Sequence, residues 1–392
     1  MHRLDLAQIP RRHELRYTPR FSEDYLESLR EKGDPLSDAV VAELASLGPI
    51  TEFHNLLGVV RERAEKGSAV CRRFVEFGQT VPTWADFAAM ERGQRLIATF
   101  PAHMGLSLFS GSLCGGAVFQ KMALITSMTG MLSGDASRRL DETSAMVIGL
   151  AFPRAIEPGG PAHELLLRVR LLHSAIRHFL VSTGRFRHPR EVPINQQDLA
   201  ITLALFGYLN VRSLARLGIT LTDEDLASYV LLWRYAGYVL GIDEELLPRD
   251  IEEQREFFLA SLKHQGKPEK MSPATKGVLD SVARSFAGDG PLFPVVQTFL
   301  HQLCRYLSGN DYVTGMQLDD LGDDYLGIRA MRFLGRVQSA LYHHVPGGSA
   351  LLYGIGAFGY RRFLAESKRH RDAKGAYRVR TVDHAAYVPQ PA

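Results

Sequence analysis

One histidine and two arginines stand in a leucine-rich stretch that has the apolar spacing of a helix. Arg170, His173 and Arg177 are three and four residues apart, so they share one face of that helix. Upstream, Arg139 and Thr143 are four residues apart on a second helical pattern, beyond a Pro- and Gly-rich hinge. Burying such groups alone costs several kcal/mol, so each needs a protein partner or a bound group.

An iron porphyrin is one bound group that would use this whole set. It needs a neutral imidazole facing the metal, cations for its propionates and an apolar pocket. His173 can provide the first, the three arginines the second, and the glycine- and methionine-rich region 104–134 the third. The sequence has no HExxH motif and no carboxylate–histidine cluster, which argues against zinc or non-haem iron. A histidine among leucines is more often a hydrogen-bonded core residue, and that alternative stays open.

The bulk composition is that of an ordinary globular protein. Of 392 residues, 45% are hydrophobic and 23% charged, and the net charge of +3 gives no general attraction to nucleic acid. Three widely spaced cysteines form no CxxC pair, which argues against a disulfide framework or a structural zinc site. The first residues lack the apolar run of a signal peptide, so we expect a cytoplasmic protein. The oligomeric state stays open.

The patterns along the chain predict an all-α protein. Apolar residues recur at helical spacing, and neither a convincing period-two run nor an Asn-Gly hairpin turn occurs. Thr83 and Thr222, each followed three residues later by an aspartate, are expected helix starts, and Gly218 and Gly241 are expected helix ends. We expect one domain, 1–392, made of an N-terminal arm (1–35), a core (82–250), a C-terminal helical part (251–366) and a basic, poorly ordered tail (367–392).

A nearly uncharged stretch precedes the two helices described first. Between His103 and Asp135 the only charge is Lys121. About 20 apolar residues suffice to span a membrane, but Ser, Gln and Thr are frequent here. We therefore expect a buried helix pair and no stable membrane span. Lys121 would either reach a pocket as a base or extend its amine to the surface, and we expect the second.

Four segments resemble a known family: RRLDETSAM, VRLLHSAIRH, VPINQQDLAITLALFGY and LLWRYAGYVLG. They are similar to the catalytic domain shared by latex clearing proteins (rubber oxygenases) and MpaB-type oxygenases, over roughly Pro82 to Pro248. The resemblance implies a globin-like all-α core that holds haem b, with additional N- and C-terminal helices. It also implies that dioxygen attacks a carbon–carbon double bond.

The resemblance implies roles for individual residues. His173 matches the family's haem-iron ligand, Arg139 the arginine beside the haem, and Thr143 the threonine on the distal side. His178 matches a further histidine of the haem-binding set, in a structural role. Glu142 stands where rubber oxygenases have a lysine, and it would either accept a proton during the reaction or face solvent.

Another departure weakens the implied polymer cleavage. The proposed catalytic glutamate of rubber oxygenases lies upstream of the arginine, but this chain has no Asp or Glu from Met104 to Gly134. We therefore expect a haem-dependent oxygenase that uses dioxygen on a small apolar, alkene or isoprenoid-like substrate. The alternative is a non-catalytic protein that binds haem or lipid.

Two further patterns have weaker claims to function. The run from Asp319 to Asp323 fits the DDxxD pattern with which isoprenoid synthases hold magnesium, but the companion motif is incomplete and misplaced. We expect a solvated acidic turn there. The basic residues of the tail would suit an anionic surface but lack interleaved aromatics, so we expect a solvated tail.

Overall fold

The structure is a computed structural model, and it confirms the all-α prediction. It describes residues 8, 10–48, 55–122, 125, 136–271, 274–318, 322 and 325–374, with the side chains of 136–142 and of several isolated positions not described. All the secondary-structure elements of these residues are helical, and no strand occurs among them. The bounds of the longer helices are as follows: α1 Glu23–Ser28, α2 Pro35–Ser46, α3 Leu56–Glu65, α4 Ala69–Gln79, α5 Phe87–Thr99, α6 Pro101–Leu106, α9 Ala136–Leu150, α10 Pro161–Ser182, α11 Gln196–Ala204, α12 Asn210–Arg216, α13 Asp223–Val239, α14 Ile251–Gln265, α15 Ala274–Ala287, α16 Phe293–Ser308, α17 Leu326–His344 and α18 Gly348–Lys374.

Shorter helical turns join these elements. Two are π-helical and continue α6 and α11, namely η4 Ser107–Leu113, followed by α7 Cys114–Gly116, and η5 Leu205–Leu209. The 3-10 turns are η1 Arg12–Glu14, η2 Leu29–Glu31, η6 Glu244–Leu246, η7 Pro268–Lys270, η8 Asn310–Tyr312 and η9 Thr314–Met316.

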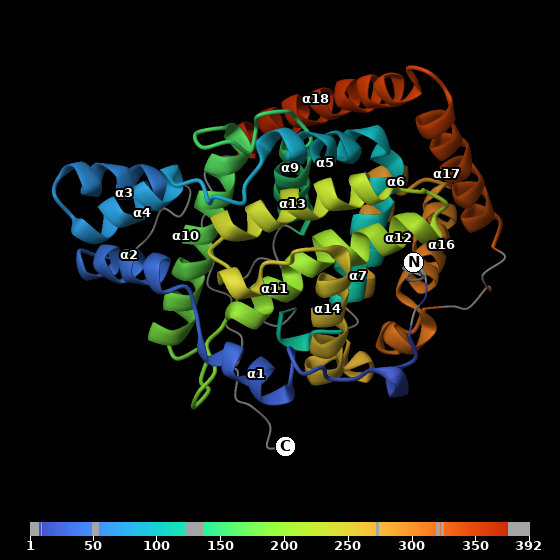
Figure 1. Ribbon diagram of the computed structural model, residues 1–392. Coiled ribbons are helices and arrows are strands. Elements are labelled where there is room, and N and C mark those ends of the chain that lie inside the picture. The colour runs from blue at the N-terminus through green and yellow to red at the C-terminus, as the bar shows by residue number, and fades with distance from the viewer. Residues whose placement is uncertain are drawn as a thin grey trace.

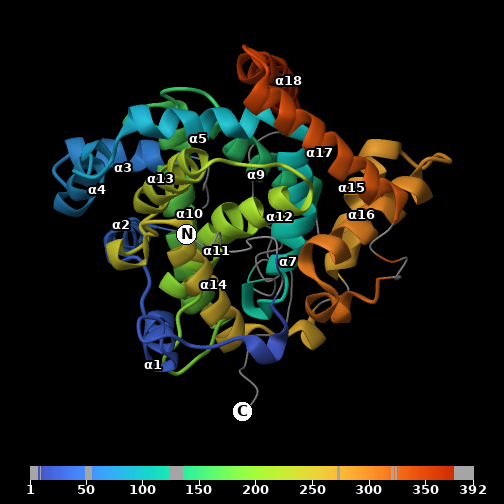
Figure 2. The same cartoon turned by 45° about the vertical axis from the view of Figure 1, so that its right-hand side comes forward.

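Three long helices are stacked in layers. α18 lies along α5, and α5 lies along α13 (Figures 1 and 2). The close approach of α5 to α13 requires a residue without a side chain, because a Cβ at Gly93 would lie 2.5 Å from the Ser228 carbonyl oxygen. On one side of the stack, α2, α3 and α4 form a small group that packs on α10 (Figure 1).

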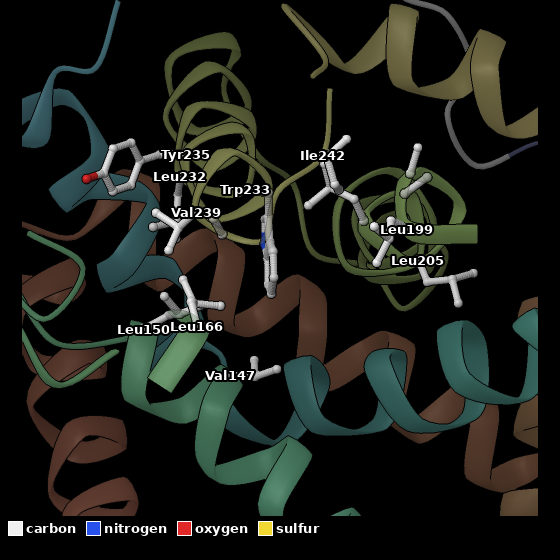
Figure 3. Close-up of a cluster of buried hydrophobic side chains, with 14 of the residues drawn as sticks. Val147, Leu150, Leu166, Leu199, Leu205, Leu232, Trp233, Tyr235, Val239 and Ile242 are labelled. Carbon is white, nitrogen blue, oxygen red and sulfur yellow. The ribbon is translucent and has the colours of Figure 1, made fainter. Parts of the chain in front are cut away.

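The main hydrophobic core lies where α9, α10, α11 and α13 meet. In Figure 3, Trp233 of α13 points between Val147 of α9 and Leu199 of α11. Trp233 is fully buried and stacks on Phe206, with the ring centroids 4.8 Å apart. Apolar burial of this kind is the main favourable contribution to folding, and here it joins the four helices that carry the candidate site.

Several expectations about helix ends need correction. α5 begins after Asp86, whose carboxylate accepts a hydrogen bond from the Ala89 amide, so the cap is Asp86 and not Thr83. Thr222 does cap α13, and Gly218 and Gly241 have the left-handed φ angles of helix ends. The tail was expected to be poorly ordered from residue 367. That boundary was placed too early, because α18 continues to Lys374. Most of the acidic 319–323 motif lies outside the described residues.

The weakly charged stretch was expected not to form a membrane span. Within the described ranges, no single helix is both long and apolar enough to cross a membrane. α5 together with Pro101–Gly116 has the length and composition, but the chain bends by 88° between them.

Asp225 connects three helices through one buried carboxylate. It caps α13 by accepting from the Thr222 amide (2.9 Å), and it also accepts from Arg92 Nε of α5 (2.6 Å) and the Tyr342 hydroxyl of α17 (2.9 Å). Burial alone would raise the pKa of Asp225, but these donors outweigh it, and the pKa lies below its ordinary value.

Asp225→Asn should therefore remove a pH-dependent contribution to stability. Because the pKa of Asp225 is lower in the folded than in the unfolded chain, its stabilisation is present above about pH 4 and is lost as the pH falls through the folded value. The variant should unfold at lower urea concentration at pH 7 and lose less stability than the wild type between pH 6 and pH 3.

Glu224→Gln is the matched control, since Glu224 pairs with the same Arg92 but is exposed. Exposed pairs contribute about 0–1 kcal/mol, so this variant should follow the wild-type pH profile. An unchanged profile for Asp225→Asn would contradict the role of the buried carboxylate.

Candidate functional site

His173 lies at the centre of α10, between the two arginines that the sequence placed on the same face. Its side chain is half-buried, and Nδ1 is shielded from solvent. α10 packs against α2 and α3 on one side of the protein and against α9 and α13 on another (Figure 1). The helix is thus fixed by α2 and α3 on one side and by the main core on the other.

Arg170 forms a buried ion pair with Asp34. Its Nε and Nη2 donate to the two carboxylate oxygens at 2.6 and 2.9 Å, and both side chains are almost completely buried. The guanidinium also lies over the Phe77 ring, 4.4 Å from its centroid. Paired, two-bond geometry of this type is the strongest form of arginine–carboxylate contact.

Arg177 makes similar contacts about two helical turns further along. Its Nε donates to Asp38 at 2.9 Å, and Nη1 donates to the carbonyl groups of Pro193 and Ile194. Ile194 has a φ of 53°, a left-handed conformation that is unfavourable for a β-branched residue. Arg177 therefore holds a strained loop against α10. Protein carboxylates neutralise both arginines, and Arg170 Nη1 is buried without a hydrogen-bond partner.

Glycine and glutamine complete the surroundings of the Arg170–Asp34 pair. A Cβ at Gly241, whose φ is 81°, would lie 2.4 Å from Asp34 Oδ2 and 2.5 Å from Arg170 Nε. The fully buried Gln196 donates to the carbonyl groups of Gly33 and Gly241 and accepts from the Asp243 amide. The NQQ segment thus connects the arm to the end of α13.

The expected distal residues lie on α9. The side chains of Arg139 and Glu142 fall outside the described part of the structure. The Thr143 side chain is exposed, yet Thr143 shares a helix face with Val147, one turn later, which is buried in the core. The core-facing side of α9 therefore becomes accessible to solvent at Thr143.

The structure does not bring His178 to the same place as His173. Five residues correspond to a rotation of about 140° on a helix, and the His178 side chain is exposed. A cofactor-binding role for His178 has no support in its position.

Lys121 does not extend to the surface, so that expectation was wrong. It is 8% exposed and forms ion pairs with Glu191 and with Asp198, the latter at 2.9 Å. Burial by itself would raise the pKa of Glu191, but Lys121 and Arg30 outweigh that effect and lower it. Burial dominates for Asp198 and raises its pKa. A buried amine with two carboxylates is a structural cluster and not a free base.

Sequence reasoning missed the partners of all these cations. Asp34, Asp38 and Glu191 lie outside the segments that carried the resemblance. The available signal was indirect: three cations in apolar helical patterns imply buried carboxylates elsewhere in the chain.

The donor set restricts the kind of metal that this region could bind. Within the part of the chain that the structure describes, no group of three or more His, Cys, Asp and Glu side chains could hold a metal ion. A single histidine such as His173 suits a metal whose other ligands come from a macrocycle. The residues present thus fit a haem iron better than an ion bound by protein alone.

Comparison with known proteins decides the family. The model of the family "ER-bound oxygenase mpaB/B'/Rubber oxygenase, catalytic domain" matches residues 101–337, more than half of the chain. The chain belongs to this family. The match continues through α14, α15 and α16 and ends within α17.

Two relatives of this oxygenase-family chain are informative. The rubber oxygenase of Streptomyces sp. (strain K30) is 25% identical over 224 residues, which cover 55% of this chain and 54% of the relative. The chain therefore matches about half the length of that protein. The structure of latex clearing protein LCP in the closed state has a TM-score of 0.56 at 18% identity, covering 88% of this chain and 91% of LCP. That likeness shows a shared fold.

Asp34→Ala should destabilise the protein strongly, because it leaves the Arg170 guanidinium buried without its carboxylate. Breaking a buried pair in this way costs about 3–5 kcal/mol, measured as the free energy of unfolding in urea. The double variant Asp34→Ala/Arg170→Met should recover much of the loss, since neither charge then remains buried alone. A loss for Asp34→Ala no larger than that of an exposed ion pair, about 0–1 kcal/mol, would contradict the structural role of the pair.

Proposed function

We propose that the chain is a haem b-dependent oxygenase that uses dioxygen on an apolar, alkene or isoprenoid-like substrate. One observation carries the proposal: the oxygenase family match spans α9 to α13, and within it α10 presents His173 from a firmly fixed helix. A mobile helix would not hold a metal ligand in one orientation. α10 is held by two ion pairs, of which Arg170–Asp34 is buried and Arg177–Asp38 is half-buried.

His173 would hold the iron, and Arg139 would supply positive charge near the haem carboxylates. When bound, haem supplies the capacity to activate dioxygen for attack on a double bond. Arg170 and Arg177 receive a different role from the one suggested by their spacing. We assign them to positioning α10, because Asp34 and Asp38 already neutralise them.

Thr143 would contribute a hydroxyl beside the proposed haem. Its side chain is exposed one turn before the buried Val147, so a small apolar molecule and dioxygen could reach it from solvent. Its hydroxyl can donate one hydrogen bond to an oxygen atom and accept another. Glu142, the preceding residue, would hold a proton where rubber oxygenases have a cation.

A small substrate agrees better with this chain than a polymer. The lysine-to-glutamate change at 142 and the lack of any acidic residue from Met104 to Gly134 both depart from the rubber oxygenases. The same departures favour the second candidate, a protein that binds haem or lipid without turnover.

Oxygen uptake distinguishes the two candidates. The haem-loaded, reduced protein is mixed with a terpenoid alkene, and oxygen consumption and carbonyl products are measured together. Alkene-dependent uptake with matching carbonyl formation is expected for the oxygenase. Uptake that does not rise above the alkene-free background, in a protein that binds carbon monoxide as haem proteins do, would instead support the binding protein.

His173→Ala should abolish haem retention while leaving the fold intact, because the Arg170–Asp34 and Arg177–Asp38 ion pairs would still hold α10. His178→Ala is the matched control, because it removes an exposed imidazole from the same helix and should retain haem. The measurement is haem per chain by pyridine haemochrome, with helicity by circular dichroism as the check on folding. Full haem occupancy in His173→Ala would contradict the ligand assignment.

A further inference from the structure

A hollow lies away from α10, among α7, α12, α14 and α16. In Figure 2, α7 and α12 lie between α14 and α16, and α16 packs on α7. The hollow is small and partly open to solvent, with a cavity volume of about 30 Å³. Its wall includes Phe258 and Leu262 of α14, Arg212 of α12, Ser308 of α16, and Tyr312. None of the residues assigned to the oxygenase site lines it.

Arg212 is the unusual feature of this wall. It is 3% exposed, and its Nε and Nη2 atoms have no hydrogen-bond partner. Burial, more than any neighbouring charge, lowers the pKa of Arg212 to about 10. The other buried arginines described above, Arg170 and Arg177, each have a carboxylate. No ion pair of Arg212 occurs in the described ranges.

A hydroxyl without a partner lies on the same wall. Ser308 Oγ, at the end of α16, is buried and makes no hydrogen bond. Leaving a buried donor without a hydrogen-bond partner is unfavourable, and more so for a charged group. Two such groups lining one hollow are explained if an anion fills it, because an anion can accept from both the guanidinium and the hydroxyl.

The walls restrict which anion would fit. Apart from Arg212 the lining is mainly aliphatic and aromatic, as at Val118, Phe258 and Leu262. One guanidinium neutralises one negative charge and matches the planar, two-oxygen geometry of a carboxylate. A phosphate dianion would keep an uncompensated charge against apolar walls. The limited volume admits only a few carbon atoms.

We propose that this hollow binds a short-chain monocarboxylate, with Arg212 holding the carboxylate, Ser308 donating a further hydrogen bond and the α14 side chains enclosing the aliphatic part.

The proposal is tested by thermal unfolding of the full chain with butyrate, using chloride and phosphate at the same pH and ionic strength as comparison anions. Butyrate should raise the melting temperature with a saturating dependence on concentration, and titration calorimetry should give about one site per chain. Chloride and phosphate should give no saturating shift. His173→Ala should keep the butyrate response, which separates this site from the haem site.

Arg212→Met is the decisive variant. It should abolish the butyrate response and, in carboxylate-free buffer, melt at the wild-type temperature or above, because it replaces an unpaired buried charge with an apolar chain of similar length. Arg216→Met is the matched control. Arg216 lies one turn away on α12 and donates to the Tyr306 carbonyl group, so its replacement should keep the response. Ser308→Ala should weaken butyrate binding severalfold without abolishing it.

Three results would overturn the proposal. The first is a wild type whose melting temperature does not respond to butyrate. The second is a large loss of stability for Arg212→Met in carboxylate-free buffer, which would show that Arg212 is paired within the protein. The third concerns Asp5, which in the sequence is the last acidic residue before Pro10, a residue of the wall. If Asp5→Asn lowers the melting temperature and creates a butyrate response absent from the wild type, the chain's own carboxylate is the occupant.

Discussion

A charge removed from water must be matched inside the protein, and this requirement organises the structure. The cost of an unpaired buried ion is several kcal/mol, comparable to the whole stability of a domain. Asp34 therefore determines where Arg170 lies, and with it how the N-terminal arm packs on α10. Lys121 in the same way joins the middle of the weakly charged stretch to the start of α11 through Asp198. The apolar core supplies most of the stabilisation, and the ion pairs determine the register of the helices.

This constraint also explains how much could be read from the sequence. Helix type, the cap at Thr222 and the end at Gly241 follow from local chemistry within a few residues, and they are confirmed. The start of α5 was missed because Thr83 and Asp86 are both good caps, and local pattern does not choose between them. The all-α class follows from the apolar spacing, which recurs throughout the chain.

The candidate site was predictable in part, for a different physical reason. Spacing places Arg170 and Arg177 on one face of a helix, but a helix face does not reveal what packs on it. Their carboxylate partners lie well over one hundred residues away in sequence, and only the folded chain brings them together. The cations were correctly recognised as needing anions, while the anions turned out to be protein side chains. The Lys121 amine is likewise paired with protein carboxylates, those of Glu191 and Asp198.

The polar residues of α10 therefore have two different roles. Arg170 and Arg177 fix the helix, and His173 between them is the imidazole that we propose as the iron ligand. Membership of the oxygenase family and the position of His173 on this fixed helix support the proposed haem site. In that proposal, the ion pairs of Arg170 and Arg177 would hold the ligand in one orientation.

The most direct test is the absorption spectrum of the purified wild-type protein, followed by its pyridine haemochrome. The account predicts a Soret band and b-type haem at close to one per chain. A colourless protein, even when haem is supplied during expression, would contradict it.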